Sequence, residues 1–235
     1  MKNKHKNISF SMLKDLFRWI RNVLLGAILL SIVMVILARF LPIPITPLMV
    51  IRNVEQVKSD KPLQLKKKWV PIEEISPNIV NAVIASEDNK FMKHWGFDFD
   101  GIKVALEKNK QRNKNAFGGS TISQQTAKNL FLWPARSWLR KGLEAYFTIL
   151  IELFWSKERI MEVYLNIIEM GDGIYGIERA SNIYYNVSAS KLTRAQSAMI
   201  AASLPSPRKY NPKNPTAYLR KRQTQILKVM SQLGK

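Results

Sequence analysis

A run of sixteen residues without a charge, VLLGAILLSIVMVILA, lies at positions 23–38 near the N-terminus. Arg39 can extend its charged end toward water, so Phe40 and Leu41 lengthen the apolar run. A helix of about 20 residues is roughly 30 Å long, which matches one hydrocarbon thickness of a bilayer. A cleavable signal peptide is the alternative, but its apolar core is usually about 7–15 residues and no small-residue cleavage site follows here. The sequence therefore predicts a retained transmembrane helix at 23–41.

The charges are divided unequally about this span. Residues 1–22 contain six basic residues and one acidic residue, which predicts a cytoplasmic basic tail by the positive-inside rule. The whole chain has 37 Lys and Arg against 17 Asp and Glu, so the part beyond the span keeps a net charge of +15. Such an excess indicates an anionic partner. Outside the cytoplasm, membrane lipids or a lipid-linked phosphate are better candidates than nucleic acid, and we expect no nucleic acid.

Length and composition limit the fold and its chemistry. A chain of 235 residues with 46% hydrophobic residues can form one compact domain with a core and an appendage. The absence of cysteine excludes disulfides, thiolate nucleophiles and cysteine-based metal sites. Prolines just after the span favour a membrane-proximal linker at 42–70. From Pro71 onward apolar residues recur at helical spacing, which predicts one mostly α-helical domain at 71–235.

The segment EDNKFMKHWGFD at 87–98 contains the first candidate catalytic group. On one helix, Glu87 shares its face with three apolar residues, Val83, Ile84 and Phe91. Its carboxylate is then at the edge of a core, and burial should raise its pKa enough for a general base near neutral pH. A carboxylate that only pairs with Lys90 is an equally good interpretation.

Two other residues of this segment are more typical of turns. His94 is followed by Gly96, which favours a turn with a hydrogen-bonded imidazole ring. Asp98 can be the N-cap of a following helix. We expect neither residue to take part in the chemistry.

The segment FGGSTISQQTAK at 117–128 predicts the start of a helix. Thr121 and Gln124 have the spacing of a capping box, and the free N–H groups of such a helix end favour phosphate. Lys128 adds a positive charge within the first turns. An ordinary capped helix would explain Thr121 and Gln124 but not the two glycines or Gln125, so anion binding is the favoured interpretation.

Three cations follow within six residues, at Arg136, Arg140 and Lys141. Arg140 and Glu144 are four residues apart and could form only a surface ion pair, which contributes a few tenths of a kcal/mol. The density of cations favours diphosphate recognition, because Arg offers paired hydrogen bonds. The aromatic and aliphatic residues among them, such as Trp138, are typical of a surface that contacts a bilayer.

Four segments, in this order, resemble the motifs of a known family. They read E-D-x-x-F-x-x-H-x-G-x-D at 87–98, G-G-S-T-I-S-Q-Q at 118–125, R-K-x-x-E at 140–144 and K-x-R-I-M-E-x-Y-L-N at 157–166. Together they are similar to the ordered motifs of the peptidoglycan glycosyltransferases, glycosyltransferase family 51, over about residues 69–230. No room remains for a transpeptidase domain, so the resemblance is to the monofunctional members. One departure is Gln196, where the family leads us to expect Glu.

The resemblance implies a mostly α fold, with a lysozyme-like helical lobe and a small membrane-proximal lobe after the transmembrane helix. It implies a bacterial inner-membrane enzyme with a periplasmic catalytic domain that polymerises lipid II into β-1,4-linked glycan strands for the cell wall. Glu87 then corresponds to the catalytic base and Glu144 to a second acid that supports the site. Residues expected to bind the donor's diphosphate and sugars are Ser120, Thr121, Gln124, Gln125, Lys128, Arg136, Arg140 and Lys141. Expected partners are lipid II, the growing glycan strand, membrane lipids, and proteins of cell-wall synthesis and division.

The residue types suit polymerisation better than cleavage. A glycan hydrolase needs a carboxylic acid to protonate the departing sugar oxygen, whereas a lipid diphosphate leaves if positive charge holds it. We expect inversion at the donor's anomeric carbon and release of undecaprenyl diphosphate. No cofactor or protein metal site is expected, and any ion on the diphosphate would be Mg²⁺ or Mn²⁺. A glycan-cleaving enzyme and a noncatalytic basic membrane tether are the remaining alternatives.

Overall fold

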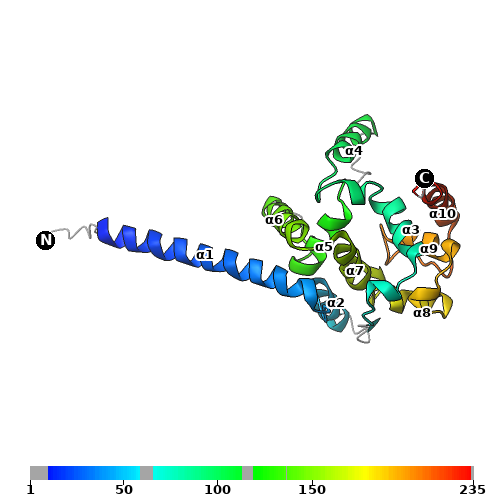
Figure 1. Cartoon of the computed structure of the whole chain (residues 1–235), viewed down its shortest axis with the longest axis horizontal. Coiled ribbons are helices and arrows are strands. Elements are labelled where there is room, and N and C mark those ends of the chain that lie inside the picture. The colour runs from blue at the N-terminus through cyan, green and yellow to red at the C-terminus, as the bar shows by residue number, and fades with distance from the viewer. Residues whose placement is uncertain (1–9, 59–65, 113–118, 136, 234–235) are drawn as a thin grey trace. The chain divides into compact units, whose positions relative to one another are not determined.

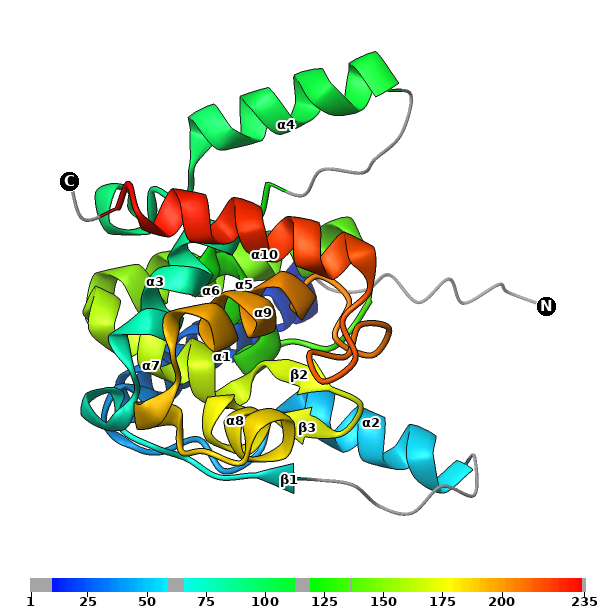
Figure 2. The ribbon, with the colours of Figure 1, turned by 90° about the vertical axis from the view of Figure 1, so that its right-hand side faces the viewer.

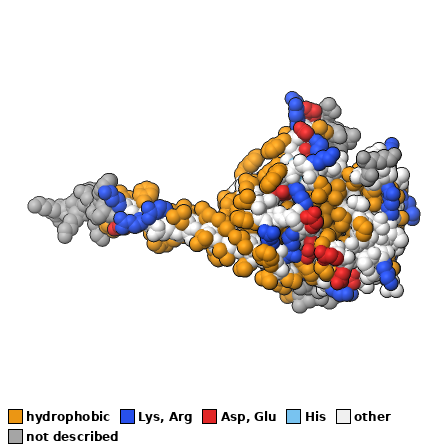
Figure 3. Space-filling view, viewed as in Figure 1, with side chains coloured by type: hydrophobic (Ala, Val, Ile, Leu, Met, Phe, Trp, Pro, Cys, Tyr) orange, Lys and Arg blue, Asp and Glu red, His pale blue; other side chains and the backbone are white. Residues whose placement is uncertain are grey.

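The computed structural model describes residues 10–58, 66–112, 119–135 and 137–233. The chain divides into two units, Met1–Leu41 and Pro42–Lys235. Helix α1, Phe10–Phe40, forms the described part of the first unit, and its segment Met12–Phe40 is long and apolar enough to cross a membrane. Hydrophobic side chains cover most of α1, and Lys and Arg gather toward its N-terminal end (Figure 3). The predicted span at 23–41 is therefore the C-terminal part of a longer helix, because residues 10–22 contain no helix breaker.

The second unit is mostly helical, as the sequence predicts (Figure 1). Its α-helices are α2 (Pro47–Lys58), α3 (Pro77–Glu87), α4 (Phe99–Arg112), α5 (Ile122–Phe131), α6 (Trp138–Phe154), α7 (Lys157–Ile167), α8 (Ile177–Tyr185), α9 (Arg194–Ser203) and α10 (Ala217–Met230). Short 3-10 helices occur at Ile72–Glu74, Phe91–Lys93 and Ala189–Lys191. The strands are β1 (Lys66–Lys67), β2 (Glu169–Gly171) and β3 (Ile174–Tyr175).

Hydroxyl side chains begin most of these helices. The N-cap oxygens of Ser76, Thr121, Ser137, Ser156, Thr193 and Thr216 each accept a hydrogen bond from a backbone N–H of the first turn. Such a cap satisfies one of the N–H groups that lack a partner within the helix. Gln196, the departure from the family pattern, completes a capping box with Thr193. Its amide oxygen accepts a hydrogen bond from the N–H of Thr193, as the carboxylate of a glutamate could.

The helices of the second unit pack in two groups. In one, α9 packs against α3 and α10, and in the other, α5 packs against α6 and α7. The fully buried stretches of α7 and α9 supply much of the core. Helix α4 projects away from the rest of the unit (Figures 1 and 2). This arrangement leaves the C-terminal end of α3 facing the beginning of α5.

A small sheet with the strand order β1-β3-β2 lies beside α8. Strand β1 runs parallel to β3, with Lys66 opposite Ile174, and β2 runs antiparallel to β3. The range 42–70, which the sequence predicts to be a linker, contains both β1 and α2. Met49 of α2 is fully buried, so its hydrophobic burial makes this helix part of the folded unit.

Asn166 attaches the chain after β1 to α7. Its Oδ1 accepts from the N–H of Val70 at 2.9 Å, and its Nδ2 donates to the carbonyl oxygen of Val70 at 2.8 Å. The same Nδ2 donates to the carbonyl oxygen of Glu162. The side chain is fully buried, so the two backbone groups of Val70 would lose these partners without it.

We predict that Asn166→Ala lowers the free energy of unfolding by about 2–4 kcal/mol, because two buried backbone groups of Val70 lose their partners. Denaturant unfolding of the full chain in detergent, followed by tryptophan fluorescence, measures this change. Asn214→Ala removes an exposed side chain and is the control, expected within about 0.5 kcal/mol of the wild type. Equal stability of the two variants would contradict the role of Asn166.

Candidate active site

Glu87 is the last residue of α3, and its side chain is 13% exposed. The helix buries Ile79, Ala82 and Val83, as the spacing predicts. It ends at Glu87 because Asp88 adopts a non-helical conformation, with φ −164° and ψ 79°. Phe91 is buried in the following 3-10 helix, so the prediction that it continues the face of Glu87 on one helix is wrong.

The carboxylate of Glu87 has three described neighbours. Oε2 accepts a hydrogen bond from Gln125 Nε2 at 3.1 Å, and Oε1 accepts one from the Ser86 hydroxyl at 3.0 Å. A guanidinium nitrogen of Arg222 is 3.6 Å from Oε1. Lys90 does not pair with Glu87 but with Asp98 and Asp100, so the idle Glu87–Lys90 pair is excluded.

Gln125 is held in turn by Tyr164 of α7. The Tyr164 hydroxyl donates to Gln125 Oε1 at 3.5 Å, which directs the amide nitrogen toward Glu87. Burial, and to a lesser degree the carboxylates of Glu87 and Asp88, raise the pKa of Tyr164 well above its ordinary value. Tyr164 therefore remains a hydrogen-bond donor at any physiological pH.

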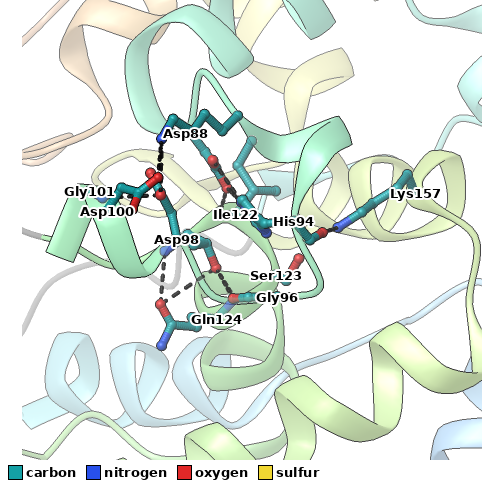
Figure 4. A network of polar contacts seen from close by, with 12 residues as sticks. Asp88, His94, Gly96, Asp98, Asp100, Gly101, Ile122, Ser123, Gln124 and Lys157 are labelled. Atoms are coloured by element: carbon teal, nitrogen blue, oxygen red, sulfur yellow. Dashed lines mark hydrogen bonds and ion pairs between the residues drawn. The ribbon is translucent and has the colours of Figure 1, made fainter.

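Asp88 connects the end of α3 to the beginning of α5 (Figure 4). Its Oδ2 accepts from the N–H of Ile122 at 3.1 Å, and His94 Nε2 lies 2.9 Å from Oδ1. The hydroxyl of Thr121 donates to the carbonyl oxygen of Gly96, and Thr121 also forms the predicted capping box with Gln124. This helix end thus already contains a carboxylate of the protein and is not the open phosphate site that the sequence suggested. Thr121 and Gln124 are both buried.

Asp98 is the predicted N-cap and His94 lies in the predicted turn, but the buried Nδ1 of His94 has no hydrogen-bond partner among the described residues. His94 is held by Asp88 in a turn, and Asp98 Oδ1 accepts from the N–H of Gly101 at the beginning of α4. Gly96 has φ +77°, and a Cβ there would come 2.7 Å from the side chain of Thr148 on α6. Glycine is therefore needed both for the left-handed backbone and for the close approach to α6.

Lys157 supports the same turn from α7 (Figure 4). Its ammonium donates to the His94 carbonyl oxygen and to Glu152 Oε1, both at 2.7 Å, and Glu152 also accepts from Ser123. These contacts explain why a lysine opens the fourth motif, a role that the motif alone does not reveal. They hold the turn between α3 and α4 in position.

Glu144 and the predicted cations form a second cluster on α5 and α6. The side chain of Glu144 is 3% exposed, and it accepts from Arg140 at 2.7 Å and from Lys141. A buried carboxylate needs such partners because removing a charge from water costs several kcal/mol. The Arg140–Glu144 pair is therefore not a surface ion pair.

Lys128 interacts electrostatically with both carboxylates, Glu87 and Glu144. Burial lowers the pKa of Lys128. The nearby charges of Arg140 and Lys141 lower this pKa further, whereas Glu144 and Glu87 raise it. Among the described residues, Nζ of Lys128 has no ion-pair partner within 4 Å. Two cations thus pair with one buried carboxylate and a third lies within its electrostatic influence, which leaves positive charge for an anionic ligand.

Two cavities adjoin these clusters. One, of about 380 Å³, lies between the end of α3 and the beginnings of α4 and α5, and both Glu87 and the exposed Ser120 line it. The other, of about 600 Å³, is lined by Lys128 and Arg140 together with residues of α2 and of the loop 132–135. Arg136, predicted to bind the diphosphate, lies outside the described residues.

Arg222 is the site residue that the sequence analysis missed. It reaches Glu87 from α10, and it also donates to the Ser86 hydroxyl at 3.1 Å. The signal was present in the sequence: Arg222 is three residues after Leu219 and four before Ile226, two buried residues of α10. An arginine on the apolar face of a helix is expected to have a buried hydrogen-bond or ion-pair partner, because burying an unpaired charge is costly.

Comparison with known proteins identifies the family of this chain. The family model described as Transglycosylase matches residues 54–231. The chain is 54% identical over 224 residues to the biosynthetic peptidoglycan transglycosylase of Bacteroides thetaiotaomicron, covering 95% of this chain and 90% of the relative. Proteins of the same name from Bdellovibrio bacteriovorus and Pseudomonas putida are 52% and 51% identical, over 91% and 95% of this chain and 85% and 94% of theirs. The chain therefore belongs to the transglycosylase family.

Proposed function

We propose that Glu87 is the general base with which this glycosyltransferase polymerises lipid II into peptidoglycan strands. The enzyme class rests on the family and on relatives named biosynthetic peptidoglycan transglycosylases. One observation carries the assignment of the base. Glu87 is a mostly buried carboxylate that lines a cavity, while its oxygens are oriented by Gln125 and Ser86.

The base acts on the acceptor. Glu87 takes the proton from the 4-hydroxyl of the acceptor's N-acetylglucosamine, and that oxygen attacks the anomeric carbon of the donor. The bond from this carbon to the diphosphate oxygen breaks, the electron pair leaves with undecaprenyl diphosphate, and the anomeric configuration inverts. Two hydrogen bonds occupy only part of the acceptor capacity of a carboxylate, so a lone pair remains for the acceptor proton. Fixing the direction of that lone pair supplies orientation.

The cations act on the leaving group. Negative charge develops on the diphosphate as the bond breaks, and preorganised positive charge lowers the energy of that state. Lys128 and Arg140 line one cavity, and Lys141 shares Glu144 with Arg140. Glu144 is best explained as the group that orients these cations, because its carboxylate is already occupied by them. Ser120 lies in the cavity of Glu87, where a sugar could contact it.

A diphosphate needs no proton to leave, so a second carboxylic acid is not required. Among the described residues, no cluster of three or more His, Asp or Glu side chains is placed to hold a metal ion. The described residues therefore supply no ligand set for a metal ion, and no step of the mechanism uses one. We propose that any Mg²⁺ or Mn²⁺ is bound by the oxygens of the diphosphate.

The charge on either side of the apolar helix supports an orientation. The basic tail favours the cytoplasm, which directs the second unit to the outer side of the inner membrane. Lipid II and the growing glycan strand would meet the enzyme there, together with membrane lipids. Proteins of cell-wall synthesis and division remain expected partners on the same ground.

We predict that Glu87→Gln lowers the polymerisation rate by about 10³-fold, since general base catalysis contributes about 10²–10⁴-fold. The amide has nearly the same volume, so the thermal unfolding midpoint in detergent should change by no more than a few degrees. Labelled lipid II and gel separation of glycan strands measure the rate. Glu158→Gln changes an exposed glutamate of α7 and should leave the rate unchanged. Full activity of the Glu87 variant would disprove the assignment.

We predict that activity declines on the alkaline side at a pH below the ordinary lysine value of 10.5, because the pKa of Lys128 is lowered by burial. The ammonium loses its proton as the pH rises through this lowered pKa, and the diphosphate then loses a cation. In Lys128→Arg the guanidinium stays charged, so the decline in activity should move to higher pH. The rate at neutral pH should fall by roughly tenfold at most. A pH profile of kcat/KM measures this shift. The exposed Lys191, changed to Arg, is the control, and an unmoved decline in the Lys128 variant would contradict the prediction.

A further inference from the structure

The C-terminal part of the chain has positive charges and no negative ones among its side chains. Residues 179–235 contain 11 Lys and Arg and no Asp or Glu. The preceding residues 42–178 are nearly balanced, with 19 basic and 16 acidic residues. Most of the excess positive charge beyond the apolar helix therefore belongs to the segment that includes α9 and α10.

Few of these cations are neutralised within the protein. Among the described residues of this segment, only Arg208 and Arg222 form ion pairs, with Asp172 and Glu87. Repulsion between uncompensated charges destabilises a folded state, so their concentration on one part of the surface favours an anionic ligand. The exposed cations without an ion pair in the described part of the segment are Lys191, Arg194, Lys209, Lys213, Arg220, Lys221 and Lys228.

Helix α10 has a side that faces the reaction centre and a side that faces solvent. The inner side is buried in the second unit, and Arg222 reaches Glu87 from there. The outer side presents three exposed cations, Arg220, Lys221 and Lys228. Lys221 and Lys228 are two helical turns apart and so lie on the same side. One helix thus contacts the proposed base and also presents a row of cations to solvent.

Neighbouring segments extend this row at both ends. Before α10, the ring of Tyr210 stacks on that of Tyr218 at 5.3 Å, and the Lys209 ammonium lies 5.6 Å from the centre of the Tyr210 ring. At the other end, the guanidinium of Arg194 donates to the carbonyl oxygen of Leu227 at 3.1 Å. The part of the second unit that carries α10 shows Lys and Arg without neighbouring Asp or Glu (Figure 3). The basic surface of α10 consists of Arg194, Lys209, Arg220, Lys221 and Lys228.

This surface lacks the apolar residues of a bilayer contact. Among the described residues after Leu153, the large hydrophobic side chains that are exposed are only Tyr218 and Leu233. A helix that binds in the bilayer interface needs an apolar face in addition to its cations. The charge therefore fits a soluble polyanion better than a lipid surface. The exposed ring of Tyr218 offers a flat apolar face on which a sugar ring can lie.

We propose that the basic surface of α10 binds the carboxylates of the peptides that the glycan strand carries. The proposal rests on the proposed function. Short peptides with free carboxylates recur along a peptidoglycan strand, so the strand is a polyanion. Opposite charge on the enzyme attracts such a strand and slows its loss by diffusion. Because Arg222 of the same helix reaches Glu87, a strand bound here stays beside the reaction centre between additions.

Binding of strands to the full chain in detergent tests the proposal. Uncrosslinked, fluorescently labelled strands are titrated with the protein in the absence of lipid II, so no synthesis occurs, and fluorescence anisotropy gives the dissociation constant. The comparison uses strands whose carboxylates have been converted to amides with carbodiimide and ammonia. Intact strands should bind about tenfold more tightly than amidated strands, and added salt should reduce this difference.

A double variant locates the binding surface. Lys221→Gln combined with Lys228→Gln should weaken the binding of intact strands about fivefold, as the loss of two exposed ion pairs allows. Lys58→Gln combined with Lys93→Gln removes the same charge from exposed lysines outside the surface and should bind as the wild type does. Tyr218→Ala should weaken the binding of intact and amidated strands by the same factor. Circular dichroism and the thermal unfolding midpoint confirm that each variant is folded.

Three results would overturn the proposal. In the first, intact and amidated strands bind equally well. In the second, the variant at positions 221 and 228 binds intact strands as tightly as the control variant does. In the third, an oligonucleotide or phosphatidylglycerol displaces the labelled strand as well as unlabelled strands do at the same concentration of negative charge. The surface would then bind any polyanion or a lipid headgroup.

These measurements are separate from the test of the base, because they involve no turnover. If Glu87 proves not to be the base, the strand still binds and the difference between intact and amidated strands remains. If the strand does not bind α10, the loss of activity in the Glu87→Gln variant stands.

Discussion

The hydrogen bond from the N–H of Ile122 to the carboxylate of Asp88 determines the geometry of the site. It joins the end of α3 to the beginning of α5, two helices that belong to different packing groups. Asp88 can make this bond only because α3 ends one residue earlier, and that ending leaves Glu87 next to Gln125. The anionic carboxylate also complements the positive end of the α5 dipole. His94, Lys157 and Glu152 then hold the intervening turn in place.

The two carboxylates of the site differ in their surroundings. Glu144 is almost completely buried and is occupied by two cations, so it serves their placement. Glu87 is held mainly by neutral donors, with Arg222 somewhat farther away, and it lines a cavity. Lys128, whose pKa is lowered by burial, lies within the electrostatic influence of both. The proposed base for the acceptor and the proposed cationic site for the leaving group are therefore neighbours that do not neutralise each other.

Sequence patterns predicted the parts of this site that depend on local spacing. The apolar helix follows from an unbroken run of apolar residues, and the capping box of Thr121 and Gln124 follows from two residues within one turn of each other. The prediction failed where a distant residue decides the outcome. Local sequence predicts an open phosphate site at the beginning of α5. In the structure, the carboxylate of Asp88, 34 residues earlier in the chain, binds the N–H of Ile122 there. Likewise, the polar composition of 42–70 suggests a linker, and only the burial of Met49 shows that α2 belongs to the folded unit.

The contact of Arg222 with Ser86 and Glu87 joins residues about 136 positions apart. At the usual pace of translation, on the order of ten seconds separates the synthesis of α3 from that of α10. During that interval the nascent polypeptide can insert its anchor, yet the carboxylate at the tip of α3 lacks its guanidinium neighbour. Assembly of the reaction centre thus waits for nearly the last segment to leave the ribosome, so incomplete chains at the membrane lack an intact centre.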